Sequence, residues 1–198
     1  MVAVPVDLRR RRILLAATTA LGAVGLGVSA VPFVLSMTPS ARAKAQGGPI
    51  EIDLSKLEPG QMLTVQWRGK PIWVLRRSNE ILSRLKTNGH FLVDPDSEVE
   101  TQQPAYAKNI GRSIKPEFFI AIGLCTHLGC VPSKKIASGA LSGLGEDWPG
   151  GYFCACHGSK FDLAGRVYKN VPAPTNLVIP PHRYLADRIV EVGVHHVV

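Results

Sequence analysis

The sequence predicts a mainly β protein, an antiparallel β fold preceded by one N-terminal transmembrane helix. Three features of the 198-residue chain indicate this class. A single long apolar run, residues 13–35, follows four consecutive arginines. Short apolar segments separated by turn residues fill residues 50–198, as they do in antiparallel β folds. Two segments rich in cysteine and histidine interrupt them and predict an inserted metal-binding subdomain.

Residues 13–35 predict the transmembrane helix. This run of 23 residues has no charged side chain. A helix of that length spans about 34 Å, enough to cross a hydrocarbon core of about 30 Å. The arginines at 9–12 predict, by the positive-inside rule, that residues 1–12 form a basic cytoplasmic N-terminus. We therefore expect a single-pass protein whose remainder lies outside the cytoplasm.

The arginines ahead of the apolar run also resemble a twin-arginine export signal. That pathway carries proteins that are already folded. Small residues at 41–45 leave cleavage of the signal as an alternative. The apolar region of a cleaved signal is usually only about 7 to 15 residues long, so an uncleaved signal anchor is favoured.

Residues 36–49 predict a flexible hinge linker, because Ala, Gly, Ser and Pro dominate them without apolar periodicity. As a flexible chain they span roughly 20 Å, and fully extended they reach up to about 50 Å. Such a linker permits movement of the domain that follows it.

Residues 50–198 have the length of one domain. Ser78 is expected to cap a short helix that stops near Gly89. Residues 131–153 contain several glycines and are expected to form a long loop. Strands are expected at 62–67 and 71–75, joined by a turn at 68–70, and at 118–122, 152–153, 177–179 and 189–194.

The basic charge is concentrated at the N-terminus. Residues 1–49 carry a net charge of +5 and residues 50–198 a net charge of +3, which together give the +8 of the whole chain. The positive charge is therefore mostly a signal of membrane topology. Residues 50–198 have no basic stripe with interleaved aromatic residues, so no nucleic-acid partner is expected.

Two short segments contain all four cysteines: residues 125–130 (Cys-Thr-His-Leu-Gly-Cys) and 154–159 (Cys-Ala-Cys-His-Gly-Ser). Each offers a cysteine and a histidine at metal-ligand spacing and has one cysteine to spare. A [2Fe-2S] cluster with two thiolates on one iron and two imidazoles on the other needs this set. A zinc site is the alternative, although the spacing differs from that of zinc fingers. Two disulfides would leave both histidines unexplained.

The two segments are followed by Lys160-Phe161-Asp162 and Val171-Pro172-Ala173-Pro174. Together they resemble the Rieske iron–sulfur subunit of the cytochrome bc1 complex, ubiquinol:cytochrome c reductase. The resemblance covers nearly the whole chain and implies a Rieske-type antiparallel β fold, in which a cluster-binding subdomain at about 121–176 is inserted. It implies one [2Fe-2S] cluster as the cofactor.

The resemblance also assigns roles to the cysteines and histidines. Cys125 and Cys154 are expected to bind one iron, and His127 and His157 the other. Cys130 and Cys156 are expected to form a disulfide between the two loops, which implies an oxidising compartment. Closing a loop of about 27 residues in this way contributes roughly 3 to 4 kcal/mol in the chain-entropy model.

The implied activity is that of a catalytic subunit of quinol-cytochrome c reductase, a proton-translocating oxidoreductase complex, which is not active alone. Two imidazole ligands make the cluster easier to reduce, with potentials of roughly −150 to +300 mV. His157 and His127 are the expected catalytic residues. His157 would take a proton from quinol while the cluster takes one electron, which then passes to cytochrome c1.

Flanking residues refine this expectation. The hydroxyl of Ser159 occupies the position where the family donates a hydrogen bond to a bridging sulfide. Relatives of high potential often have a tyrosine two positions later, where this chain has Phe161, so we expect a lower potential here. Residues 171–174 resemble the family's proline loop, and we expect its Pro172, Ala173 and Pro174, with Leu128, to shield the cluster and form the docking surface.

The implied partners are quinol, membrane lipid and the cytochrome b and cytochrome c1 subunits, in a dimeric complex. The implied location is the bacterial inner membrane, with the cluster domain in the periplasm. Two other classes remain open at this point. One is a Rieske subunit of another exported oxidoreductase such as arsenite oxidase, and the other is a zinc-stabilised exported domain without enzymatic activity.

Overall fold

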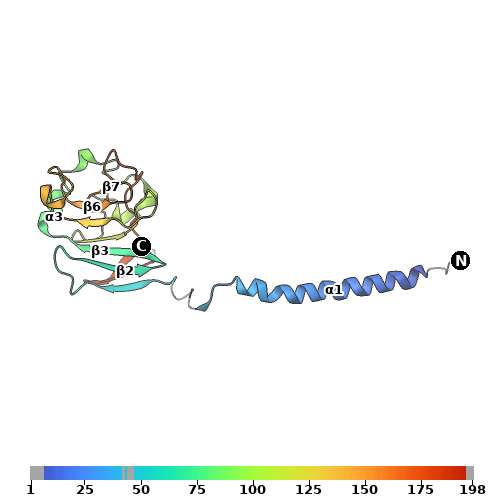
Figure 1. Cartoon of the computed structure of the whole chain (residues 1–198). Coiled ribbons are helices and arrows are strands. Elements are labelled where there is room, and N and C mark those ends of the chain that lie inside the picture. The colour runs from blue at the N-terminus through green and yellow to red at the C-terminus, as the bar shows by residue number, and fades with distance from the viewer. Residues whose placement is uncertain (1–6, 42, 44–46, 195–198) are drawn as a thin grey trace. The chain divides into compact units, whose positions relative to one another are not determined.

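The structure is a computed structural model that describes residues 7–41, 43 and 47–194. The chain forms two compact units, residues 1–46 and residues 47–198. Parts of the predicted N-terminus, hinge linker and cleavage sites lie outside the described residues. Figure 1 shows the long helix of the first unit and the strands of the second.

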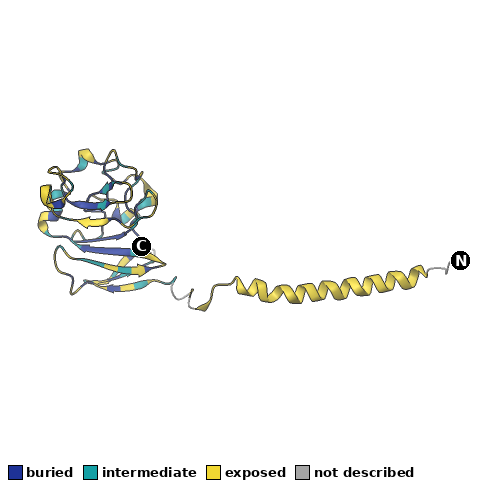
Figure 2. Cartoon of the chain, viewed as in Figure 1, coloured by how far each residue is buried: buried dark blue, intermediate teal, exposed yellow. Residues whose placement is uncertain are grey.

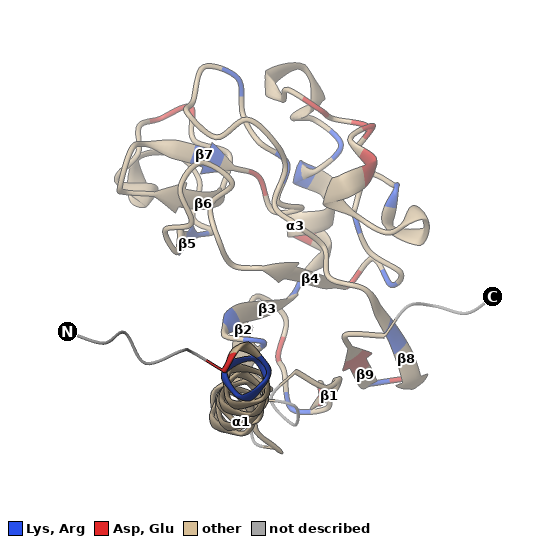
Figure 3. Ribbon diagram, turned by 90° about the vertical axis from the view of Figure 1, so that its right-hand side faces the viewer, with Lys and Arg blue, Asp and Glu red and all other residues tan. Residues whose placement is uncertain are grey.

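The first unit contains helix α1 (Leu8–Ser36). The helix starts earlier than residue 13 because Asp7 caps it: its carboxylate accepts hydrogen bonds from the backbone N–H groups of Arg9 and Arg10. The arginines, which are good helix formers, thus belong to its first turns (Figure 3). The helix is long and apolar enough to cross a membrane, and none of its residues is buried within the chain (Figure 2).

The regular structure of the second unit is mainly short strands. A short helix, α3 (Asn79–Arg84), follows the third strand. The 3-10 helices are η1 (Gly89–Phe91), η2 (Glu100–Gln102), η3 (Ala105–Ala107) and η4 (Gly139–Ser142). The strands are β1 (Ile50–Asp53), β2 (Met62–Trp67), β3 (Lys70–Arg76), β4 (Phe118–Ile122), β5 (Ser133–Lys135), β6 (Gly151–Cys154), β7 (Ser159–Phe161), β8 (His182–Ala186) and β9 (Ile189–Val192).

The strands form three antiparallel sheets with the orders β1-β9-β8, β2-β3-β4 and β5-β6-β7. The prediction of a mainly β, antiparallel fold after one N-terminal helix is confirmed. The sheet β5-β6-β7 comes from the chain between β4 and β8, and its strands flank the second cysteine segment.

The sheet β2-β3-β4 separates two hydrophobic cores, because the side chains of β3 and β4 alternate between its faces. Ile72 and Val74 pack with the first and last strands of the unit, in a core that includes Ile52 and Val190. Trp73 and Leu75 point to the other face. There they pack with Phe119, Tyr152, Phe161 and both free cysteines. This second core supports the predicted metal site.

Several expected elements are correct in place but differ in length. Strand β2 has the expected bounds, and the turn to β3 needs only two residues, Arg68 and Gly69, both with positive φ. The Ser78 hydroxyl caps α3 by accepting from the N–H of Ile81. The helix nevertheless ends at Arg84, well before Gly89, which instead begins the 3-10 helix η1.

Two expectations about strands are wrong. Residues 177–179 form no strand, because successive backbone groups bond to different segments: the Leu177 N–H donates to Gly165, that of Ile179 donates to Gln102, and Val178 accepts from Ile122. Conversely, the expected loop at 131–153 contains strand β5, which pairs with β6. The polar sequence Ser-Lys-Lys of β5 gives no strand signal, since all three residues are exposed at a sheet edge.

Candidate metal centre

The two cysteine segments form loops of the same design. The first follows β4, and the second lies between β6 and β7. In each loop the first cysteine accepts a backbone hydrogen bond from a glycine four residues later, Gly129 to Cys125 and Gly158 to Cys154, both at 2.9 Å. Both glycines have a φ of 80°, in the left-handed region that favours glycine. A Cβ at either position would meet nothing within 4 Å, so the glycines serve the turn geometry, not space.

The structure brings the four predicted ligands to these two loops. Cys125 and Cys154 are free thiols that are 4% and 2% exposed. His127 is half-buried and His157 is exposed, and their ring centroids are 4.7 Å apart with an interplanar angle of 89°. The two thiols thus lie inside the core while the two imidazoles lie at its edge.

The Nδ1 atom of His127 is buried and has no hydrogen-bond partner among the described residues. A buried nitrogen with an unused lone pair is unfavourable unless it has a partner, and metal coordination provides one. This atom is the clearest local sign that the loops are shaped around a group that the chain itself does not supply.

The environment of Cys154 contains opposing influences on its ionisation. Burial, and the hydrogen bond to the neighbouring Cys125 thiol, raise the pKa of the Cys154 thiol. The backbone N–H groups of Cys156 and His157 donate to its sulfur and act in the opposite direction. A metal binds the thiolate form of cysteine. These two N–H groups would therefore stabilise the negative charge of the Cys154 sulfur when it is a metal ligand.

Cys130 and Cys156 form a disulfide that links the two loops, the pairing that the resemblance implies. The sulfur of Cys154 lies within 4.8 Å of both disulfide sulfurs. Of these three, only Cys154 can offer a thiolate, since the other two are already bonded to each other.

The proline loop is tied to both cysteine segments by hydrogen bonds. The backbone N–H of Ala173 donates to Ser159 Oγ at 3.1 Å, and Thr126 Oγ1 donates to the carbonyl of Thr175 at 2.7 Å. No local pattern in the sequence marks Thr126, because only the folded chain brings it beside residue 175. Ser159 is fully buried, and with its oxygen accepting from Ala173 its hydroxyl proton is still available as a donor.

The predicted shielding residues differ in exposure. Leu128 is 70% exposed, and Pro172 and Pro174 are also exposed, so these apolar side chains are available at the surface to form the predicted shield. Ala173 is only 3% exposed and contributes its backbone instead. Phe161 is completely buried within the second core.

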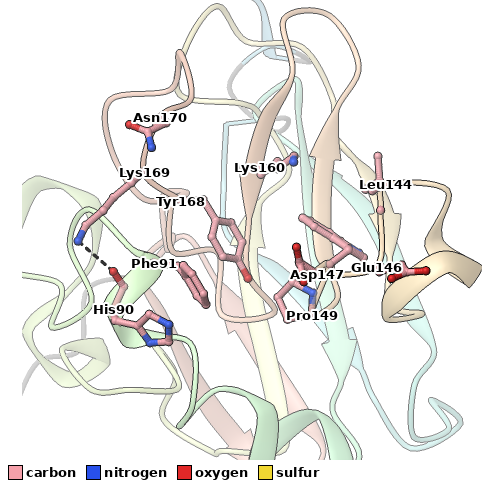
Figure 4. A pocket seen from close by; sticks show the side chains of 12 residues that line it. His90, Phe91, Leu144, Glu146, Asp147, Pro149, Lys160, Tyr168, Lys169 and Asn170 are labelled. Carbon is pink, nitrogen blue, oxygen red and sulfur yellow. Dashed lines mark hydrogen bonds between the residues drawn. The ribbon is translucent and has the colours of Figure 1, made fainter.

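A pocket of about 430 Å³ lies elsewhere on this unit, between η1, the segment after η4 and the residues after β7 (Figure 4). Phe91, Trp148 and Tyr168 supply its aromatic lining, and Lys169 Nζ donates to the carbonyl of His90 at its edge. None of the predicted metal ligands lines it. The candidate metal centre, carried by the two cysteine loops, is therefore distinct from this pocket.

The residues present fit a [2Fe-2S] cluster. Two buried free thiols, two adjacent imidazoles, an unpartnered ring nitrogen and thiol-directed N–H donors are the donor set that such a group requires. Together with the antiparallel fold, this site defines an iron–sulfur protein of the Rieske class.

Comparison with known proteins agrees with that class. The family model of the Rieske [2Fe-2S] domain matches residues 51–182, and the model described as "Ubiquitinol-cytochrome C reductase Fe-S subunit TAT signal" matches residues 5–40. The ubiquinol-cytochrome c reductase iron–sulfur subunit of Allochromatium vinosum is 61% identical over 188 residues, which cover 95% of this chain and 90% of that protein. The corresponding subunit of Blastochloris viridis is 40% identical over 185 residues, 93% of this chain and 92% of that one.

Among solved structures, a chain of a hyperthermophilic respiratory Complex III is similar, with 27% identity and a TM-score of 0.46 over 88% of this chain and 97% of that one. The chain belongs to the family of ubiquinol-cytochrome c reductase iron–sulfur subunits. Its apolar helix α1 and the matching N-terminal family model make it a membrane-anchored subunit.

Proposed function

We propose that this chain is the Rieske [2Fe-2S] subunit of a quinol-cytochrome c oxidoreductase. The observation that carries the proposal is the pair of matched loops, each with one buried free thiol and one imidazole near the surface. Family membership supplies the context, because the relatives named above are subunits of ubiquinol-cytochrome c reductase.

In this proposal Cys125 and Cys154 hold one iron, and His127 and His157 hold the other. The buried Nδ1 of His127 supports ligation through that atom. When bound, the cluster supplies a one-electron acceptor of raised potential. The backbone N–H groups of Cys156 and His157 stabilise the Cys154 thiolate, and the Cys130–Cys156 disulfide holds the loops around the site.

His157 is the residue proposed to meet the quinol. It is exposed, so its free ring nitrogen can accept a hydrogen bond from a quinol hydroxyl and then its proton. Leu128, Pro172 and Pro174 are exposed apolar side chains around the site, and they would exclude water from the docked quinol. A dry apolar rim strengthens the hydrogen bond to the imidazole, since the local dielectric constant is low.

The proposed partners are cytochrome b, which shares the quinol site, and cytochrome c1, which takes the electron onward, within a dimeric complex. The proposed location is the bacterial inner membrane. The arginines at the start of α1 favour a cytoplasmic N-terminus and therefore a periplasmic cluster domain. The residues between α1 and the second unit would act as the hinge linker of that domain.

A potentiometric EPR titration of the membrane-bound protein at several pH values tests this function. We expect a Rieske-type signal with a positive midpoint potential that falls as the pH rises. That slope shows that a proton is bound together with the electron. A negative, pH-independent midpoint, or zinc in place of iron in metal analysis, would contradict the proposal.

A further inference from the structure

Trp73 is a large buried side chain at the base of the candidate metal centre. It lies on the central strand β3, pairs with Ala121 of β4 and is 2% exposed. Its side chain belongs to the core that contains both free cysteines. Trp73 comes from a part of the sequence about 50 residues before the first cysteine segment, which carries no metal-ligand signal of its own.

The indole of Trp73 lies directly against Gly123, two residues before Cys125. A Cβ built on Gly123 would come within 2.2 Å of the indole Cε2 and 2.4 Å of its Nε1. Real side chains never approach so closely, so this position accepts only glycine while Trp73 is present. The Gly123 N–H also donates to the carbonyl of Pro71 at 2.8 Å, which holds this backbone next to β3. The start of the first loop is therefore fixed against Trp73.

The indole also stacks on Tyr152, which lies two residues before Cys154. The ring centroids of Trp73 and Tyr152 are 5.0 Å apart, and the ring planes differ by 21°. The Tyr152 hydroxyl is buried and has no hydrogen-bond partner among the described residues, so ring packing is what fixes this side chain. The start of the second loop is therefore also fixed against Trp73.

No strand ladder joins β4 to β6, because they belong to different sheets. The spacing of the two ligand cysteines then depends on side-chain packing and on the disulfide. The disulfide connects later positions of the loops, Cys130 and Cys156. Trp73 connects their beginnings, at the same offset of two residues before each ligand cysteine.

We propose that Trp73 is a positioning residue of the metal centre, which sets the distance between the Cys125 and Cys154 sulfurs through Gly123 and Tyr152. This inference rests on the proposed function, because it assumes that these two cysteines bind one iron. A smaller side chain at position 73 lets the two loops move relative to each other. The bound cluster is then expected to have altered ligand geometry and to lose iron more readily.

Trp67 provides a matched control. It is also a buried tryptophan packed against a glycine, since a Cβ on Gly193 would come within 2.8 Å of its ring. It belongs to the other core, which contains neither free cysteine. Trp67→Leu removes the same atoms as Trp73→Leu and also the hydrogen bond from Trp67 Nε1 to Gly48, so it costs at least comparable stability.

The experiment compares Trp73→Leu, Trp73→Phe, Tyr152→Phe and Trp67→Leu with wild type, in membranes that contain the assembled complex. The readouts are the EPR line shape of the reduced cluster, the rate of iron release to a chelator and the thermal unfolding midpoint of the protein. We expect Trp73→Leu to shift the EPR g values and to release iron about tenfold faster, because the loops open more often. Trp67→Leu should lower the unfolding midpoint while leaving the EPR line shape unchanged.

Trp73→Phe keeps a ring between the two loops and should restore most of the wild-type line shape, and Tyr152→Phe should resemble wild type. The inference is overturned if Trp73→Leu retains the wild-type g values and iron-release rate. It is equally overturned if Trp67→Leu changes both readouts as much, since general destabilisation would then explain them. If the wild-type protein itself gave no [2Fe-2S] signal, the proposed function would be refuted. Failure of the position-73 inference shows only in the variants, so the two failures are distinguishable.

Discussion

Ser159 has a hydroxyl group that the fold buries completely and that accepts a hydrogen bond from the backbone N–H of Ala173. Ala173 lies between two prolines, so its amide is the one donor that residues 172–174 possess. The hydrogen bond from Ala173 orients the Ser159 hydroxyl and polarises its O–H bond. The hydrogen bond that the Ser159 hydroxyl donates is therefore stronger. Under the proposed function that acceptor is a sulfur of the cluster.

The first prediction concerns this pair. Ser159→Ala is expected to lower the midpoint potential by roughly 60 mV, because it removes one charge-assisted hydrogen bond of about 1.5 kcal/mol. Ala173→Pro, which removes the amide donor and also adds a ring at a buried position, should lower it by less. In the double variant the second change should add nothing, because its effect passes through Ser159. Redox titration of the three variants measures this, and additive shifts would show that the two residues act separately.

The second prediction concerns Phe161. Phe161→Tyr adds a hydroxyl in the core that contains the free cysteines, and it is expected to raise the midpoint potential by roughly 60 mV through a new hydrogen bond. Because Phe161 is fully buried, a hydroxyl without an acceptor would instead cost about 1 to 3 kcal/mol of stability. An unchanged midpoint together with a lower unfolding temperature would contradict the prediction.

At the scale of elements, the proline loop and the first cysteine loop are joined by one side-chain bond, from Thr126 Oγ1 to Thr175. Both loops lie at the edge of the domain, with Leu128, Pro172 and Pro174 exposed. Under the proposed function this bond helps to hold the docking surface, and Thr126 itself lies between the proposed ligands Cys125 and His127.

The third prediction tests that bond. Thr126→Val keeps the shape of the side chain but removes the hydroxyl, at a cost of about 1 kcal/mol. Quinol oxidation by the assembled complex is expected to slow, while iron content stays at the wild-type level. Thr126→Ser retains the hydroxyl and is the matched control, which should behave as wild type. Loss of iron in the valine variant alone would show that the bond supports the metal centre and not the docking rim.

At the scale of the whole molecule, the two units require different surroundings: the second unit folds around its own cores, whereas α1 requires an apolar environment. The described residues of the second unit form three hydrophobic core clusters, whereas α1 buries none of its residues within the chain. A helix so apolar and so exposed needs lipid or partner helices around it. This contrast is the physical basis for a membrane-anchored domain.

The fourth prediction follows from this contrast. The full chain is expected to remain in the membrane pellet after extraction with alkaline carbonate. Leu21→Arg with Val24→Arg places two charges in the middle of α1, each costing about 2.5 to 3.5 kcal/mol on insertion scales, and should release the protein or prevent its assembly. Leu21→Ala with Val24→Ala is the control and should stay in the pellet. Extraction of the wild-type chain by carbonate would contradict a transmembrane anchor.

The sequence by itself determined the features that depend on local patterns. The 23 uncharged residues required an apolar surrounding, the alternating short segments required antiparallel strands, and the two cysteine segments identified the candidate ligands. Each signal lies within a few residues, so no knowledge of distant contacts is needed. For the same reason two expectations are wrong: residues 177–179 form no strand, and the expected loop at 131–153 contains strand β5. Distant backbone partners decide what these residues form.

The tertiary structure alone decided how the site is supported. It placed Trp73 between Gly123 and Tyr152, and it joined the proline loop to Ser159 and Thr126. These contacts join residues far apart in the chain, and neither residue of a pair carries a mark of its partner. Local sequence specifies which groups can bind the metal, whereas packing between distant segments fixes how far apart those groups are held.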